Sequence, residues 1–404
     1  LLVLVVVGVI NFLVALSVHQ SENSQHHDLD LLRRKSASAP LNAKKNLSRK
    51  NSSTVTSLDA PKTGPGHEIR SDEAKPHTLP QIVYDTSRET AEYRKRLETR
   101  PASKERLKRV DLTKIHNAVC NDGSPGAFYF KAAPGGGDEA LWLVFMQGGG
   151  WCWDAASCKQ RTRDEPALTS SKKWPNAHDK EGIFTPDPDL SPFARANKAF
   201  VPYCSSDAFL GNAGASPRTF GMHFRGQVLV EGVLQTLVAD FGMRSGHTLV
   251  FGGCSAGGRG ALFTLDYVPA MLPPGVQLFG LFDAVLWIDG FDQRMIHQTK
   301  MVMETTNASG RLGPKCVEAH TGDDRWKCMF GQHRISYVQQ PFLVSSSQYD
   351  SFQVVTKLGH PPPWSPKDIE AVAGFRQAVQ STLGALDQTK ASFSVACYQH
   401  CLTA

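Results

Sequence analysis

Short apolar runs, each bounded by glycine or proline, recur from about residue 111 onward in this chain of 404 residues. Runs this short, with apolar residues on both faces, are typical of strands buried in a parallel sheet. Six of them set the pattern: GAFYF, ALWLVFM, KAFVPYC, HTLVFGG, VQLFGLF and PFLVSS. Helical patterns lie between them. The alternation predicts a single α/β domain over residues 111–404, with a mostly parallel sheet covered by helices on both faces.

Two of the helical patterns are especially clear. The first forms one apolar stripe, made of Val230, Val233, Leu234, Leu237, Val238 and Phe241. The second begins with Ser365 and Asp368, the S-x-x-D form of a capping signal. Its apolar residues then follow in phase: Ile369, Val372, Phe375, Val379, Leu383 and Leu386. Both segments are predicted to be amphipathic helices that pack on the sheet.

The first 110 residues have a different texture. Residues 1–18 carry no charge and are just long enough to cross a bilayer, which favours an uncleaved signal anchor over a cleaved signal peptide. Residues 19–80 are polar without a sustained period and predict a disordered stem. Residues 81–110 carry mixed charges at helical spacing and predict a solvated lead-in helix. The net charge of +6 comes from this region and fits a solvated flank better than a docking surface.

The cysteine content indicates an oxidising compartment. Nine cysteines are more than a cytosolic enzyme needs, whereas secreted domains keep disulfides. We therefore expect a secreted, cell-wall or membrane-anchored protein of the secretory pathway, and the N-x-S/T triplets at Asn46, Asn51 and Asn307 are compatible with glycosylation there. A metal site is the competing explanation for clustered cysteines, but no C-x-x-C or H-x-x-x-H spacing supports one.

One serine stands in a glycine-rich turn between an apolar run and a helical pattern. In LVFGGCSAGGRGALF, residues 253–257 fit G-x-S-x-G, a motif that requires a strand before it and a helix after it. A nucleophile on such a turn needs small neighbours, and the helix amino terminus directs free N–H groups at an oxyanion. The motif is short. Without catalytic partners, Ser255 would be only a serine in a tight turn.

A second glycine cluster follows the apolar run LWLVFM. Gly148, Gly149, Gly150 and Trp151 resemble the HGGG-type loop that lends a backbone N–H group to an oxyanion hole. Three glycines standing alone would indicate a flexible β-turn. Two such clusters at the ends of two predicted buried strands favour the catalytic interpretation.

Chain order selects the candidate base and its acidic partner. In α/β-hydrolases the nucleophile is followed by Asp or Glu and then by His. Asp350 follows the predicted strand PFLVSS and ranks first as the acid; its rivals in LFDAVLWIDG are Asp283, which ranks second, and Asp289. His360 precedes three prolines in a predicted exposed loop, whereas His400 follows a β-like run near the chain end. His400 is therefore the predicted base.

With these residues in place, the chain resembles the pectin acetylesterase/Notum family of carboxylester hydrolases. Matching segments lie in family order over residues 118–401: AVCNDGSPGAFYF, FMQGGGWCWD, FVPYCSSDAFLG, GGCSAGGRGAL, GLFDAVLWIDG, RWKCMFG and ACYQHC. The resemblance implies an α/β-hydrolase-like fold and a catalytic triad of Ser255, Asp350 and His400. It also implies oxyanion-hole donors on the backbone of Gly150, Trp151 and Ala256.

The resemblance has further implications for the cysteines and the chain ends. It implies disulfides that join Cys152 to Cys158, Cys120 to Cys204 and Cys316 to Cys328. Cys254 is expected to be a buried free thiol, and Cys397 and Cys401 to lack their partners, because the sequence is expected to be truncated soon after His400. Residue 147 departs from the family pattern, since it is Gln where Glu is usual, and residues 1–80 have no counterpart.

The implied activity is two-step acyl transfer without a metal or organic cofactor. The expected substrate is an acylated extracellular polysaccharide such as pectin, from which acetyl groups are removed. Two alternatives stay open: a Notum-like deacylase of lipidated proteins, and a non-catalytic glycan-binding protein on the same scaffold. Residues 1–18 would tether the protein to a membrane if they are retained, and no nucleic-acid partner is expected.

Overall fold

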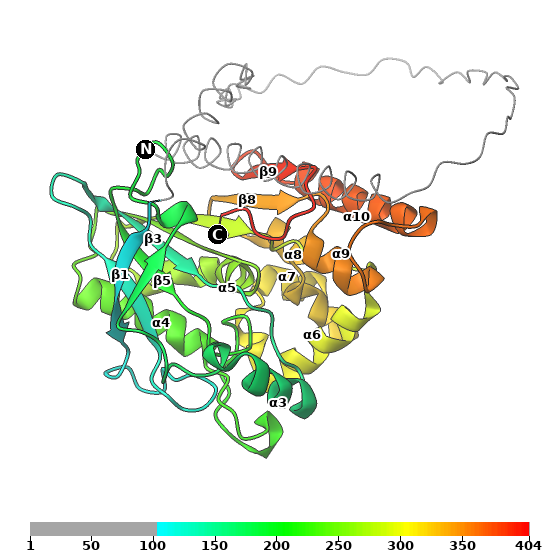
Figure 1. The fold of residues 1–404 in the computed structure, drawn as a ribbon, viewed down its shortest axis with the longest axis horizontal. Helices are drawn as coiled ribbons and strands as arrows, with labels where there is room; N and C mark the ends of the chain where they lie inside the picture. Colours follow the sequence, from blue (N-terminus) through cyan, green and yellow to red (C-terminus); the bar gives the residue numbers. More distant parts are fainter. Residues whose placement is uncertain (1–102, 404) are drawn as a thin grey trace, which may run out of the picture.

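A sheet of nine strands runs through the part of the chain that the computed structural model describes, residues 103–403 (Figure 1). The signal anchor or peptide predicted at residues 1–18 and the stem at 19–80 lie outside the described residues. Strand order across the sheet is β4-β1-β2-β5-β3-β6-β7-β8-β9. The strands are β1 (Glu105–Asp111), β2 (Ala127–Lys131), β3 (Asp138–Met146), β4 (Ala177–Lys180), β5 (Ala196–Val201), β6 (Thr248–Cys254), β7 (Gln277–Asp283), β8 (Phe342–Ser347) and β9 (Ala391–Val395).

Strand direction divides the sheet into two parts. Every pair from β5 through β3 to β9 is parallel. The pairs that join β4, β1, β2 and β5 are antiparallel. The six apolar runs of the sequence are the strands β2, β3, β5, β6, β7 and β8, as predicted. The α/β-hydrolase-like, mostly parallel single domain is thereby confirmed.

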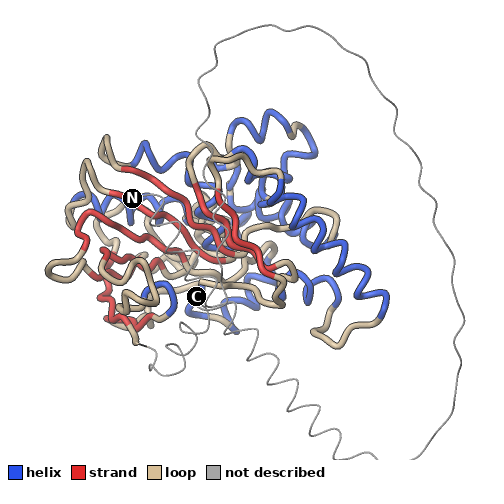
Figure 2. The backbone as a smooth tube through the Cα atoms, turned by 90° about the horizontal axis from the view of Figure 1, so that it is seen from above, coloured by secondary structure: helices blue, strands red, loops and turns tan. Residues whose placement is uncertain are grey.

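Helices alternate with the parallel strands and lie on the outside of the sheet (Figure 2). The α-helices are α3 (Ala155–Asp164), α4 (Gly226–Ala239), α5 (Ala256–Thr264), α6 (Gln293–Thr306), α7 (Pro314–Ala319), α8 (Gly331–Arg334), α9 (Ser351–Leu358) and α10 (Pro366–Gly384). The predicted capping signal is formed at α10, where Ser365 and Asp368 cap each other's backbone N–H groups. Among the described residues, no helix has the length and apolar character needed to cross a membrane.

The helix predicted over residues 81–110 is wrong at its carboxyl end. Residues 105–111 form strand β1, in which Leu107 is buried and the flanking Arg106 and Lys108 are exposed. Hydrogen bonds to β2 and β4 on either side fix this strand, and such pairing overrides the helical spacing of the charges. The range 81–102 lies outside the described residues.

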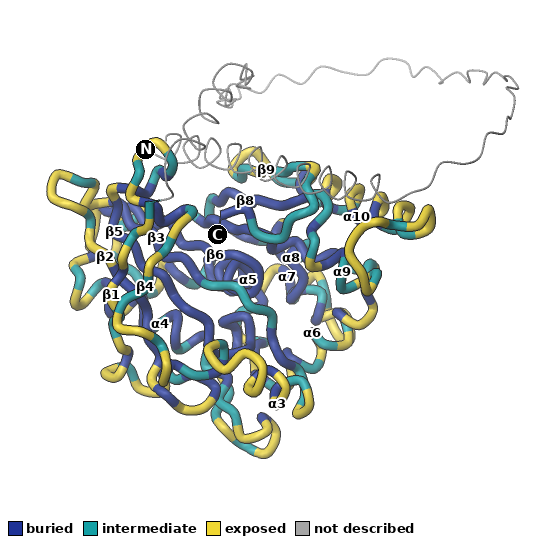
Figure 3. The backbone as a smooth tube through the Cα atoms, in the orientation of Figure 1, coloured by how far each residue is buried: buried dark blue, intermediate teal, exposed yellow. Residues whose placement is uncertain are grey.

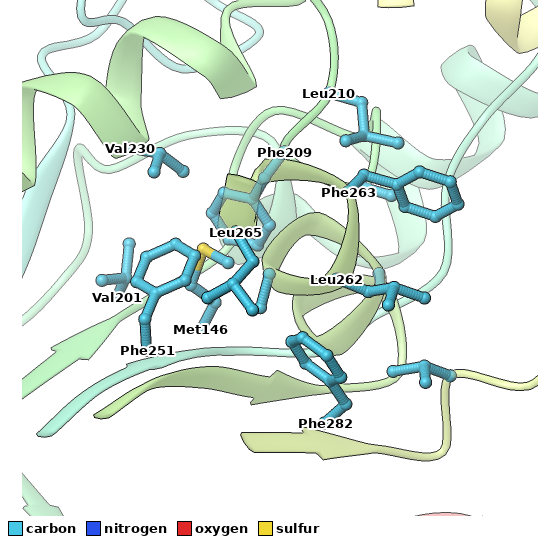
Figure 4. Packing of buried hydrophobic residues seen from close by; sticks show 14 of the residues in the cluster. Met146, Val201, Phe209, Leu210, Val230, Phe251, Leu262, Phe263, Leu265 and Phe282 are labelled. Atoms are coloured by element: carbon cyan, nitrogen blue, oxygen red, sulfur yellow. The ribbon is translucent and has the colours of Figure 1, made fainter. Parts of the chain in front are cut away.

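Two apolar cores lie on opposite faces of the sheet, which is buried along its centre (Figure 3). The larger core takes in residues of α4, α5, α6 and α10. Figure 4 shows part of it: Met146 and Phe251 from the strands lie beside Leu265, which follows α5, and Phe282 lies on the strand side of Leu262. The smaller core contains apolar residues of loops and of the turn Gly182–Phe184 but none from a described α-helix. Helical cover of both faces was predicted, and the described residues provide it on one face.

Candidate active site

Ser255 lies at the turn between β6 and α5, with φ 55° and ψ −122°. A positive φ at a residue with a side chain is strained; such strain costs on the order of 1–3 kcal/mol and persists only where the surroundings enforce it. Here the close approach of neighbouring backbones enforces it. A Cβ on Gly257 would lie 2.2 Å from the Met146 carbonyl oxygen, and a Cβ on Gly253 would lie 2.6 Å from the carbonyl carbon of Gly257. The glycines of the motif therefore allow the strand, the turn and the helix to meet at Ser255.

His400 joins Ser255 to Asp350. Its Nε2 lies 2.8 Å from Ser255 Oγ, and its Nδ1 lies 2.8 Å from Asp350 Oδ2. Asp350 is nearly fully buried. An ionised carboxylate only accepts, so Nδ1 carries the proton and Nε2 is left to accept the serine hydroxyl proton. The structure thus brings together the three residues that the sequence singled out, from positions up to 145 residues apart.

The environment of His400 makes its imidazole more basic than usual. Burial alone would lower the pKa of His400, but the charge and hydrogen bond of Asp350 and the charge of Asp283 outweigh it, so the pKa is raised above 6.5. A raised pKa stabilises the imidazolium form. That is the form the ring would adopt if it took a proton from Ser255.

The glycine loop after β3 lies against the serine. A Cβ on Gly148 would lie 2.9 Å from the Cβ of Ser255, and Gly149 and Gly150 both have positive φ. No hydrogen bond between described residues uses the backbone N–H of Gly150, Trp151 or Ala256. Ala256 begins α5, whose first-turn N–H groups have no partner within the helix. The three predicted oxyanion-hole donors therefore have no hydrogen-bond partner among the described residues.

The buried side chain of Arg259 packs against Trp151 of this loop, and the sequence did not predict this contact. The guanidinium carbon of Arg259 lies 4.2 Å from the ring centroid of Trp151 and 3.5 Å from that of Trp287. Arg259 Nη2 donates a hydrogen bond to the Met329 carbonyl oxygen at 2.6 Å. Burial lowers the pKa of Arg259 to about 9, so the group stays cationic at neutral pH. Cation–π contacts with two tryptophans stabilise the charge and fix the ring next to a candidate oxyanion donor.

Asp283, the second-ranked acid, lies close to the triad but does not contact His400 through a hydrogen bond. Its Oδ2 accepts hydrogen bonds from the backbone N–H groups of Leu402 and Thr403 and from the Thr403 hydroxyl, each at 2.7 Å. Burial raises the pKa of Asp283 to about 6, and these hydrogen bonds oppose that rise. The rejected base, His360, is exposed and contacts Pro361 and Asp368 at the start of α10.

The structure contains four disulfides in its described residues. Three are those that the resemblance implied: Cys120–Cys204, Cys152–Cys158 and Cys316–Cys328. The predictions for Cys254 and Cys401 are wrong, because these two cysteines are bonded to each other, whereas Cys397 is free in the described residues. The chain positions of these two cysteines are 147 residues apart, and only the folded sheet shows that they meet.

Three potential metal-ligand atoms lie within 4.8 Å of one another, on Cys254, Asp283 and Cys401. Metal ions bind the thiolate form of cysteine. Here the two sulfur atoms are bonded to each other, so the group offers one carboxylate and no thiolate. These three residues therefore do not fit a metal ion while Cys254 and Cys401 are joined by the disulfide.

Asp207, a fully buried carboxylate in the segment FVPYCSSDAFLG, was not predicted from the sequence. It accepts hydrogen bonds from the Ser205 hydroxyl and from the backbone N–H groups of Phe209, Gly211 and Gly226. These contacts tie the loop after β5 to the start of α4. Asp207 precedes an apolar run, which could have marked it as a buried cap, but four donors that converge on one carboxylate are visible only in the fold.

Comparison with known proteins places this site in a family. The model of the pectinacetylesterase family matches residues 100–404. Palmitoleoyl-protein carboxylesterase notum1 of Xenopus laevis is 30% identical over 74% of this chain and 64% of its own length. Pectin acetylesterase 5 of Arabidopsis thaliana is 28% identical over 75% of each chain.

A solved structure agrees with these sequence relatives. The structure of the Wnt deacylase Notum from Drosophila superposes with a TM-score of 0.67 at 25% identity, covering 74% of this chain and 87% of that one. The chain spans 64% and 60% of the lengths of the Xenopus and mouse Notum proteins that it matches. On the strength of the family match over residues 100–404, this chain belongs to the pectinacetylesterase family.

Proposed function

We propose that the protein is a serine carboxylesterase that forms an acyl-enzyme on Ser255. His400 Nε2 takes the hydroxyl proton as Ser255 Oγ attacks the ester carbonyl carbon, and Asp350 holds the ring in the tautomer that leaves Nε2 free. The same nitrogen then gives the proton to the departing alcohol. The observation that carries the proposal is the continuous line of contacts from Ser255 through His400 to Asp350, with both distances at 2.8 Å.

The tetrahedral intermediate places a negative charge on the former carbonyl oxygen. Backbone N–H groups of Gly150, Trp151 and Ala256 are the proposed donors to it. Loss of one such donor typically costs about 3 kcal/mol of barrier. Water activated by His400 then attacks the acyl-enzyme and releases the acid, and this scheme requires no metal or organic cofactor.

The first candidate substrate is an acetylated polysaccharide such as pectin. Two findings support it: the family model, and a pectin acetylesterase relative of which this chain covers 75%. The alternative is removal of a longer acyl group from a protein. It is supported by the relatives named palmitoleoyl-protein carboxylesterases and by the structural likeness to Drosophila Notum. A non-catalytic glycan-binding protein would not need the complete Ser255–His400–Asp350 arrangement, so the geometry favours an enzyme.

The proposed site of action is the secretory pathway or the cell exterior. Four disulfides in the described residues are typical of that environment. A membrane tether through residues 1–18 and the absence of a nucleic-acid partner stay predictions from the sequence.

The test compares p-nitrophenyl acetate with p-nitrophenyl octanoate as substrates for the wild-type protein and Ser255→Ala. We expect Ser255→Ala to reduce kcat by about 1,000-fold or more, with an unchanged circular dichroism spectrum. Full activity in this variant would refute the esterase assignment. A higher kcat/KM for the acetyl ester supports an acetylated polysaccharide as the substrate. A higher kcat/KM for the octanoyl ester supports a protein with a longer acyl group as the substrate.

A further inference from the structure

A disulfide runs beside the serine–histidine contact. Cys254 immediately precedes Ser255, and Cys401, its disulfide partner, immediately follows His400. The covalent bridge therefore spans the same two segments as the 2.8 Å contact between Ser255 Oγ and His400 Nε2. The other three disulfides of the described residues do not join sequence neighbours of the triad.

Asp283 makes a second connection between the same segments. It is the last residue of β7, and its backbone oxygen accepts a hydrogen bond from the Ser255 N–H at 2.9 Å. Its side chain holds Leu402 and Thr403 through the three hydrogen bonds to Oδ2. One fully buried residue thus contacts the serine turn with its backbone and the histidine segment with its carboxylate.

The segment that carries His400, residues 396–401, is held by few hydrogen bonds of helices or strands. It follows β9, an edge strand that pairs only with β8 among the described strands. Residues 396–401 form neither helix nor strand. The position of His400 therefore depends on individual contacts rather than on a hydrogen-bonded ladder.

We propose that the Cys254–Cys401 disulfide and Asp283 form a positioning clamp that holds His400 against Ser255. Asp283 is a positioning residue and not a spare acid of the triad, because its side chain contacts the chain after His400 and leaves the imidazole to Asp350. The proposal rests on the proposed esterase function. A misplacement of about 1 Å in a catalytic group can cost on the order of 100-fold in rate, so the clamp acts on kcat.

The first test removes the bridge. Cys254→Ala/Cys401→Ala is compared with Cys316→Ala/Cys328→Ala, which removes a disulfide that touches no triad neighbour. With p-nitrophenyl acetate, we expect the first variant to lose about 100-fold in kcat with little change in KM. The control variant should keep the wild-type kcat. Wild-type kcat in a folded Cys254→Ala/Cys401→Ala protein would overturn the role of the bridge.

The second test separates the hydrogen bonds of Asp283 from its charge, and it does not depend on folding without a disulfide. In Asp283→Asn, the amide oxygen replaces Oδ2 and accepts the same three donors, while the amide nitrogen replaces Oδ1, which has no partner among the described residues. Measured at alkaline pH, where His400 is neutral, Asp283→Asn should keep most of the wild-type kcat. Asp283→Ala should lose about 100-fold. Equal kcat values for the Asn and Ala variants would overturn the positioning role.

Failure of the clamp and failure of the esterase proposal give different results. If the esterase proposal is wrong, the wild-type protein shows no Ser255-dependent hydrolysis and a fluorophosphonate probe does not label Ser255. If only the clamp is wrong, the wild type is active and labelled, and the Asp283 and cysteine variants match it.

Discussion

Asp350 holds His400 with one carboxylate oxygen and caps a helix with the other. Oδ2 lies 2.8 Å from His400 Nδ1, while Oδ1 accepts the Gln353 N–H at 3.0 Å as the cap of α9. The helix cap fixes the direction in which the second oxygen points. The rigid element that orients the imidazole is therefore the amino terminus of α9, which follows the buried strand β8.

The double role of Asp350 predicts how an amide would behave there. In Asp350→Asn, the oxygen can keep the cap, so the amide nitrogen faces His400 and its N–H groups cannot accept from Nδ1. The ring is then held in the wrong tautomer, and we expect kcat to fall by about 10³–10⁴-fold. The measurement is steady-state hydrolysis of p-nitrophenyl acetate, with thermal unfolding as the control for the cap. A loss of less than tenfold in a folded protein would contradict the assigned role.

The parts of this fold that are local in sequence were predictable. The central parallel strands β3, β6 and β7 each carry an apolar run because both of their faces are covered, and the serine turn needs glycines at fixed spacing because two backbones approach there. Chain order requires an acid and then a histidine after Ser255, and the predicted strand before Asp350 and the β-like run before His400 favoured these two residues over Asp283 and His360. That order works because the carboxyl ends of parallel strands lie on one edge of the sheet.

The features that were missed depend on contacts between distant segments. Cys254 looked like a buried thiol because its partner, Cys401, arrives only when the chain after β9 returns to the centre of the sheet (Figure 1). Arg259 was not singled out from the sequence, because nothing in the residues around it indicates that it is buried. Its stabilisation comes from the faces of Trp151 and Trp287, and only the folded chain brings these rings together.

Asp207 predicts a stability effect without a role in proton transfer. Its carboxylate accepts four hydrogen bonds, so Asp207→Ala leaves four buried donors without a partner. We expect the free energy of unfolding to fall by about 3–5 kcal/mol. Urea unfolding measures this change, and Asp240→Ala, at an exposed residue that ends α4, is the matched control with an expected change within about 0.5 kcal/mol. Equal stability of the two variants would show that the Asp207 contacts contribute little.

The raised pKa of His400 predicts the pH dependence of hydrolysis. The imidazole acts as a base only when it is neutral, and the carboxylates of Asp350 and Asp283 hold its proton more tightly than in a free histidine. Activity should therefore be low at pH 6, rise as the pH increases, and reach half of its maximum above pH 6.5. A profile of kcat/KM against pH measures this midpoint in the free enzyme. Asp283→Asn removes one of the two charges and should move the midpoint to lower pH, whereas a wild-type midpoint at or below 6.5 would show that burial outweighs the carboxylates.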